Sequence, residues 1–232
     1  MPLAGTGCAI ATPLLAKVAR MRGGEPFDAH SLVEDYELGL RLADLGARGV
    51  FARVEDAGEL VAVRSFFPGT LAAAITQKAR WMTGIAFAGW DRTGWAGRLA
   101  VADHWMRARD RRAPIAMLVL AIAYLAALLW GVAVAAHWWT GTTPLLDPLP
   151  GWLLAINGLL LGWRLMMRMA CTGRLYGLVE ALLAVPRFVV GNAVALAAAP
   201  KALARYLRLL GGQAPVWDKT GHDFPELDLP AR

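Results

Sequence analysis

Two carboxylates stand side by side at Glu34 and Asp35, within the stretch SLVEDYELGLRLADLGARG. Ser31 and Glu34 have the Ser-x-x-Glu spacing of a helix capping box, so Glu34 already has a structural explanation. Asp35 has only a general one, because any carboxylate in a first helical turn complements the helix dipole. The alternative is chemical, since a carboxylate held at the edge of an α/β domain can act as a general base.

A second polar group lies in TQKARWMTGIAFAGW, residues 76–90, shortly before a long apolar run. Gln77, Arg80 and Trp81 fall on one face of a helix, and Gly84 continues that face. A tryptophan beside an arginine is typical of a membrane interface, but a glutamine gains nothing there. The set also suits a bound sugar: tryptophan offers a flat face to a pyranose ring, arginine donates to phosphate oxygens, and glutamine bonds hydroxyls.

Residues 1–67 are predicted to position the two carboxylates as part of an α/β domain. Residues 1–12 are rich in small residues and glycine, which favours a loop and a short strand. The helix that begins near Ser31 is expected to end before Gly46, a natural C′ residue. Residues 50–54, VFARV, are then expected to form a short strand.

Residues 68–113 are predicted to form an amphipathic helix and a basic cytoplasmic segment. Thr70 can cap the helix, whose apolar residues recur at helical spacing, so we expect it to lie in the membrane interface. The arginines of RARDRR, residues 107–112, follow it. Under the positive-inside rule, these arginines predict an anchor on the cytoplasmic side.

Residues 114–204 are predicted to form the membrane region, and 205–232 a polar tail. The segments 114–139 and 152–170 are long and apolar enough to cross a bilayer. Segment 178–200 is interrupted by polar residues and proline, so it either spans or forms a re-entrant piece buried against protein. The charge asymmetry places the part before residue 114 in the cytoplasm and 140–151 outside.

The composition indicates a membrane protein. Hydrophobic residues make up 57% of the chain and the mean hydropathy is +0.43, which is high for a soluble protein. The net charge of +6 comes from basic residues beside apolar runs, so no nucleic-acid partner is predicted. Cys8 and Cys171 fit no metal-binding spacing. His222 with Asp218 and Asp223 in the tail is only weak support for a metal site.

Taken together, the two polar groups resemble the shared pattern of the membrane-embedded processive glycosyltransferases of family 2, the cellulose- and hyaluronan-synthase-like enzymes. In that family a Thr-Glu-Asp triplet precedes Gln-x-x-Arg-Trp on an interfacial helix, ahead of transmembrane helices. Here the triplet is Val33-Glu34-Asp35, with valine in place of threonine, and QKARW occupies residues 77–81. With PRFVVGN and WDKTGHDFP, these stretches look closer still to the bacteriophage N4 adsorption protein B-like inner-membrane branch.

The resemblance implies an inverting glycosyltransferase that transfers a hexose or N-acetylhexosamine from a nucleotide-sugar donor to a glycan acceptor, a growing surface polysaccharide. Residues 1–67 would be the acceptor-side part of a GT-A-like domain, with an α-helical transmembrane region after it. Asp35 would be the catalytic base at the cytoplasmic side of the bacterial inner membrane. The substrate-binding residues implied are Glu34, Gln77, Arg80, Trp81, Gly5 and Thr6.

The same resemblance implies Mg²⁺ or Mn²⁺ at an Asp-x-Asp motif in a donor-binding half. The sequence contains no Asp-x-Asp, so no metal ligand is assigned. The chain is therefore expected to be the carboxy-terminal portion of such an enzyme, inactive without a missing N-terminal half or partner subunit. The alternative is a non-enzymatic membrane subunit or export partner. The sugar, the linkage, processivity and regulation by cyclic di-GMP stay open.

Overall fold

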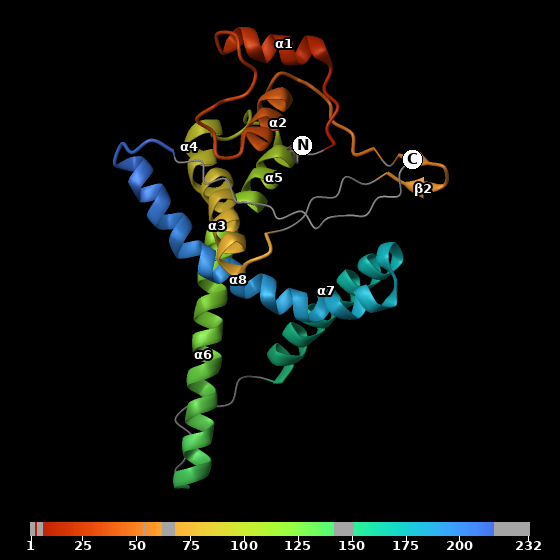
Figure 1. Ribbon diagram of the computed structural model, residues 1–232. Helices are drawn as coiled ribbons and strands as arrows, with labels where there is room; N and C mark the ends of the chain where they lie inside the picture. The colour runs from red at the N-terminus through yellow and green to blue at the C-terminus, as the bar shows by residue number, and fades with distance from the viewer. Residues whose placement is uncertain (1–2, 4–6, 53, 62–67, 142–150, 216–232) are drawn as a thin grey trace. The chain divides into compact units, whose positions relative to one another are not determined.

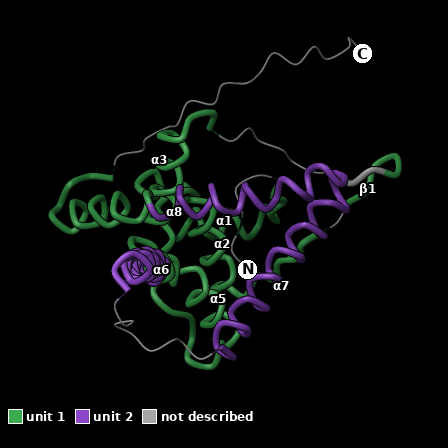
Figure 2. Tube along the Cα trace, turned by 90° about the horizontal axis from the view of Figure 1, so that it is seen from below, with its two compact units in different colours: residues 1–117, 197–232 green, residues 118–196 purple. Residues whose placement is uncertain are grey.

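The computed structural model describes residues 3, 7–52, 54–61, 68–141 and 151–215. The chain divides into two compact units, shown in different colours in Figure 2. Unit 1 combines Met1–Met117 with Ala197–Arg232, and unit 2 is Leu118–Leu196. Gly5, Thr6 and the metal-like residues of the tail lie outside the described residues.

Unit 1 is mostly helical (Figure 1). Its helices are α1 (Thr12–Met21), α2 (Glu34–Asp44), α3 (Leu71–Met82), the π-helix η1 (Thr83–Ala88), α4 (Gly89–Thr93) and α5 (Val101–Arg111). The sequence analysis assigned no element to α1, whose first turn contains a proline, a residue well suited to that position. Val18 of α1 packs on Leu38 and Leu42 of α2.

The predicted α/β class is not seen in the described part of unit 1. Its only sheet there joins β1 (Glu55–Asp56) to β2 (Glu59–Leu60), with Glu55 opposite Leu60. The predicted strand at 50–54 is wrong at its four described positions, where Val50 and Phe51 are exposed. Ala57 and Gly58, with φ of 49° and 82°, form a two-residue turn between the paired residues Asp56 and Glu59. The first strand therefore consists of Glu55 and Asp56, which follow Val54.

The prediction for the start of α2 is wrong, whereas the prediction for its end is confirmed. The capping box is wrong: α2 begins after Val33, and the Ser31 hydroxyl accepts from the Val33 N–H (3.1 Å) and donates to Glu37 (2.8 Å). The prediction for Gly46 is confirmed, because its φ is +82° and its N–H donates to the Ala43 carbonyl at 2.9 Å. The Ala47 N–H donates to the Leu42 carbonyl at 3.0 Å, and the two hydrogen bonds together form a Schellman motif.

Helix α3 is covered by protein on two faces. As predicted, Thr70 caps it, with Oγ1 accepting from the Ala73 N–H at 3.3 Å. Ala79 and Met82 pack against Ala198 and Ala202, which belong to the last turns of α8 (Leu178–Leu210). The interfacial location of α3 stays a prediction, because protein contacts occupy these apolar positions.

The basic segment 107–112 is partly internal, which corrects its interpretation as an anchor. Arg107 is fully buried and pairs with Asp44 (2.7 Å) and Asp103 (3.0 Å). Arg111 is also buried and stacks beneath Trp90 and Trp95, with 4.9 and 5.3 Å from its guanidinium carbon to the ring centroids. Arg109 and Arg112 are the exposed members of the cluster.

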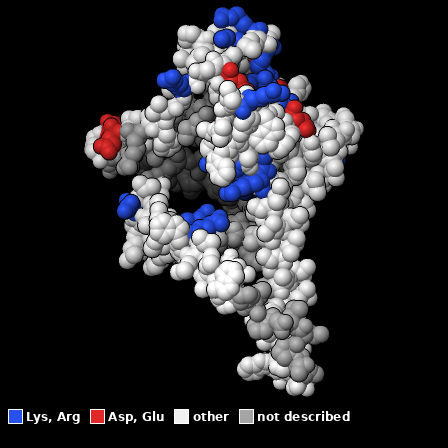
Figure 3. Space-filling view, turned by 180° about the vertical axis from the view of Figure 1, so that it is seen from behind, with Lys and Arg blue, Asp and Glu red and all other residues white. Residues whose placement is uncertain are grey.

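Three helices in the described part of the chain are long and apolar enough to cross a membrane; the sequence predicted this for the first two and left the third open. They are α6 (Ala113–Thr140), α7 (Gly151–Tyr176) and α8. No Lys, Arg, Asp or Glu occurs in α6, and its lower surface is white in Figure 3. Helix α8 runs without a break through Pro186, so a break in the backbone there is not observed. The two alternatives for this segment, crossing the membrane or forming a re-entrant piece, both stay predictions.

Candidate functional site

The two sequence motifs meet in unit 1. The Arg80 guanidinium of α3 donates to the Leu32 carbonyl at 2.9 Å, across 48 residues of sequence. The half-buried Trp81 packs against a cluster that contains Val33 and Tyr36. These contacts hold the α3 motif against the segment that leads directly into Glu34 and Asp35.

Gly84 brings the two segments into close contact. A Cβ added to Gly84 would lie 2.7 and 2.9 Å from the two Cγ atoms of Val33, and 3.2 Å from the Leu32 Cβ. Val33 is itself 4% exposed, so it has little room to move. Gly84 lies in the π-helix η1, and such wide turns often occur at functional sites. A side chain at this position would therefore push η1 away from residues 32 and 33, which lead into Glu34 and Asp35.

Gly84→Ala is expected to destabilise unit 1 by about 1–3 kcal/mol, the usual cost of overpacking a filled site. The measurement is urea unfolding of the detergent-solubilised chain, followed by hydrogen exchange at the Val33 amide. Gly131→Ala is the control, because a Cβ at that helical glycine meets nothing within 4 Å. Val33→Ala should restore part of the loss. Equal stability of Gly84→Ala and Gly131→Ala would show that the contact is not tight.

One carboxylate oxygen of Asp35 accepts a hydrogen bond from the backbone, and the other has no hydrogen bond within the described residues. Oδ1 accepts from the N–H of Tyr36 at 2.8 Å, which fixes the orientation of the carboxylate in the first turn of α2. Within the described part of the chain, no hydrogen bond reaches Oδ2. The side chain is half-buried, as is that of Glu34. A fixed, partly exposed carboxylate with an unengaged oxygen has the features required of a proton acceptor.

Tyr36 stabilises the same turn from within the protein. It is 6% exposed, and its hydroxyl lies 3.4 Å from a carboxylate oxygen of Asp110, to which it donates. Burial, and then the negative charge of Asp110, raise the pKa of Tyr36 to about 12. Tyr36 is therefore a neutral hydrogen-bond donor at physiological pH.

The sequence analysis missed a buried ion pair behind this turn. Glu37 is 2% exposed, and its Oε1 accepts from Ser31 and from the Arg92 Nε at 2.6 Å. The hydrogen bond to Glu37 raises the pKa of Arg92 against the effect of burial. The helices α3, η1 and α4 follow one another without a gap over residues 71–93, and we call this segment the α3–η1–α4 rod. Arg92 belongs to α4, so its ion pair with Glu37 attaches the end of the rod to α2. No spacing signal marks this pair, since its partners lie 55 residues apart.

Asp28 extends the ion pair toward the start of the chain. It contacts Arg92 and also pairs with Arg22 at 2.7 Å. Burial alone would raise the pKa of Asp28, but Arg22, the N–H of His30 and Arg92 together lower it well below its usual range. The rod that carries Arg80 is therefore attached to the α2 segment at two places: through Arg80 at Leu32, and through Arg92 at Glu37 and Asp28.

Gln77 is almost completely buried on α3. It is 7% exposed, and its side-chain oxygen has no hydrogen-bond partner among the residues that the structure describes. Such a buried acceptor requires a donor. No group of three or more His, Cys, Asp or Glu side chains suitable for a metal occurs in the described ranges. The residues present there do not fit Mg²⁺ or Mn²⁺.

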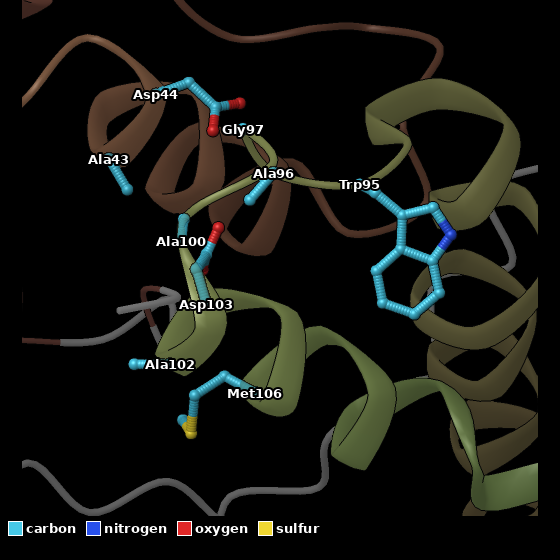
Figure 4. A pocket seen from close by; sticks show the side chains of 9 residues that line it. All are labelled: Ala43, Asp44, Trp95, Ala96, Gly97, Ala100, Ala102, Asp103 and Met106. Atoms are coloured by element: carbon cyan, nitrogen blue, oxygen red, sulfur yellow. The ribbon is translucent and has the colours of Figure 1, made fainter.

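A cavity of about 700 Å³, drawn in Figure 4, has no residue of either motif in its lining. Its charged side chains, Asp44 and Asp103, are already paired with Arg107. A second cavity of about 250 Å³ is lined by Leu32, Glu37, Gly84 and Arg92, among other residues. We place the candidate site at the contact between the motifs, because Arg80 and Trp81 contact the segment that leads into Glu34 and Asp35.

Comparisons with known proteins identify the family of the chain. The family model described as "Glycosyl transferase family group 2" matches residues 1–167. Bacteriophage adsorption protein B of Escherichia coli (strain K12) and bacteriophage N4 adsorption protein B of Escherichia coli O157:H7 are each 30% identical over 250 residues. The alignments cover 98% of this chain and 33% of each relative, so the chain spans about a third of their length. No solved structure matches the chain significantly.

Proposed function

Because this chain belongs to glycosyl transferase family group 2, we propose that it transfers a sugar from a nucleotide-sugar to an acceptor hydroxyl of a growing surface glycan. The observation that carries the proposal is the contact of Arg80 with Leu32, which places the QKARW helix against the segment before Asp35. The reaction would occur at the cytoplasmic face of the inner membrane, where the apolar helices α6, α7 and α8 hold the enzyme.

In the proposed mechanism, Asp35 Oδ2 accepts the proton of the acceptor hydroxyl. The oxygen then attacks the anomeric carbon, and the bond from that carbon to the nucleoside diphosphate breaks. The diphosphate leaves with the bonding electron pair, so one displacement inverts the anomeric configuration. The base is effective because the Tyr36 N–H already holds its other oxygen in place.

The motif residues on α3 would bind the substrates. The charge of Arg80 would favour the diphosphate, and the unpacked part of the Trp81 ring would take a pyranose face. Gln77 would accept a hydrogen bond from a sugar hydroxyl, the donor that its side-chain oxygen requires. We propose Glu34 for a second acceptor hydroxyl, and Gly5 and Thr6 for the acceptor-side loop.

Mg²⁺ or Mn²⁺ is proposed to accompany the donor diphosphate, as the sequence resemblance implies. Since the described residues do not provide its ligands, no step is assigned to the ion. The donor-binding half is proposed to come from residues other than those described. A non-enzymatic subunit is the second candidate, favoured by the names of the two relatives, which are both called adsorption proteins.

The stereochemistry of the product tests the proposal. Membranes that contain the chain and a donor-binding half would receive UDP-α-glucose or UDP-α-N-acetylglucosamine labelled with ¹³C at the anomeric carbon. A single displacement predicts a β-linked product, identified by its one-bond C–H coupling in the NMR spectrum. An α-linked product would contradict the role of Asp35 as a simple base. No product from either donor would favour the non-enzymatic candidate.

A further inference from the structure

Helix α7 has two arginines, Arg164 and Arg168, within the segment that is long and apolar enough to cross a membrane. A hydrocarbon core of about 30 Å takes about 20 helical residues. The uninterrupted apolar part of α7, Gly151–Trp163, provides about 20 Å at the usual rise per residue. If α7 crosses the bilayer, Arg164 and Arg168 therefore lie in the hydrocarbon region, whereas Arg174 can reach the boundary. Intramembrane charges of this kind are rare and usually functional.

Both guanidinium groups point to the same aromatic ring on α8. The guanidinium carbon of Arg164 lies 5.1 Å from the centroid of Phe188, and that of Arg168 lies 5.5 Å from it. Two cations over one ring repel each other, so the ring alone does not balance them. Simple extension toward water along the helix would not bring both arginines to one side chain.

Among the described residues of unit 2, no carboxylate is available to neutralise the two arginines. In unit 2, Glu180 is already paired with Arg187 at 2.5 Å. No hydrogen bond or ion pair joins Arg164 or Arg168 to any other residue in the described ranges. Each guanidinium carries five N–H donors, and hydrocarbon offers no acceptors for them. An anion with several acceptor oxygens would satisfy both.

We propose that Arg164, Arg168 and Phe188 form a binding site for the phosphate group of a membrane amphiphile. Guanidinium groups bind phosphate oxygens with paired hydrogen bonds, and two of them match its charge. The surrounding surface of α7 is apolar and exposed, as at Met167, which suits an attached acyl or prenyl chain. The site is independent of the proposed sugar transfer and lies entirely within unit 2.

Native mass spectrometry of the full chain in detergent tests the site, with phosphatidylglycerol as the probe and diacylglycerol as the phosphate-free match. Wild-type protein should retain one phosphatidylglycerol and no diacylglycerol. Arg164→Gln/Arg168→Gln should weaken retention at least tenfold, because glutamine keeps much of the length but not the charge. Arg174→Gln, on the same helix, should behave like wild type. Phe188→Leu keeps both charges and should weaken retention several-fold.

Equal retention of phosphatidylglycerol by the wild type and the double variant would overturn the proposal, since the lipid would then be adventitious. Equal retention of diacylglycerol would do the same. Inorganic phosphate is added as a competitor to identify the source of the anion. Displacement only at concentrations far above that of the lipid supports a lipid phosphate. Displacement at matched concentration would support a phosphate site and overturn its assignment to an amphiphile.

Discussion

Asp35→Asn is expected to lower the rate of sugar transfer by about 10²–10⁴-fold, the usual contribution of a general base. Asparagine has nearly the same shape, and its side-chain oxygen can still accept from the Tyr36 N–H. It cannot take a proton from the acceptor hydroxyl. Binding of the nucleotide-sugar should stay nearly unchanged, because the base acts in the transition state and does not hold the donor.

The measurement compares initial transfer rates with equilibrium binding of the donor in the same membranes. Asp56→Asn is the matched control, since Asp56 is an exposed carboxylate in β1, and its rate should equal that of wild type. Glu34→Gln tests the role of the neighbouring carboxylate separately from that of Asp35. For this variant we expect a higher KM for the acceptor and a smaller change in kcat. Unchanged turnover in Asp35→Asn would remove Asp35 from the role of base.

Arg92→Ala is expected to destabilise unit 1 by about 3–5 kcal/mol, the range for removing one partner of a buried ion pair. The substitution would leave Glu37, with 3% of its side chain exposed, without its cation. It would also free the end of the α3–η1–α4 rod from α2. Chemical unfolding of the detergent-solubilised chain gives the free energy, and hydrogen exchange reports whether residues 31–35 loosen.

Arg109→Ala provides the comparison for Arg92→Ala. Arg109 is about half exposed and pairs only with its neighbour Asp110, so its removal should cost about 0–1 kcal/mol. Replacing both partners, as in Arg92→Met/Glu37→Leu, should recover much of the stability because no charge then stays buried. If Arg92→Ala is no more destabilising than Arg109→Ala, the ion pair does not hold the rod to α2.

Local sequence signals predicted the elements that carry the site. Gly46 ends α2 as expected, because glycine adopts positive φ without strain, and Thr70 caps α3 through its own hydroxyl. The three apolar segments are helices, and their apolar composition could be recognised because it continues over many helical turns. The helical spacing of Arg80 and Trp81 also predicted a common face, and that face packs toward α2.

Contacts outside the simple sequence patterns account for what the sequence did not predict. Ser31 has the spacing of a cap, but its hydroxyl donates to the buried Glu37, so α2 starts later. The strand predicted at 50–54 failed because the turn at residues 57–58 determines which residues pair. The bridge from Arg92 to Glu37 depends on how the rod packs on α2, and no local pattern contains that information.

The most direct test of the central claim is transfer of radiolabelled sugar from UDP-sugars by membranes that contain the wild-type chain or Asp35→Asn. Each is assayed alone and with a donor-binding half supplied, in the presence of Mg²⁺. The account predicts labelled glycan from the wild-type chain with the donor-binding half, and a loss of at least a hundredfold in Asp35→Asn. Equal product from both chains, or none from the folded wild-type chain, would contradict it.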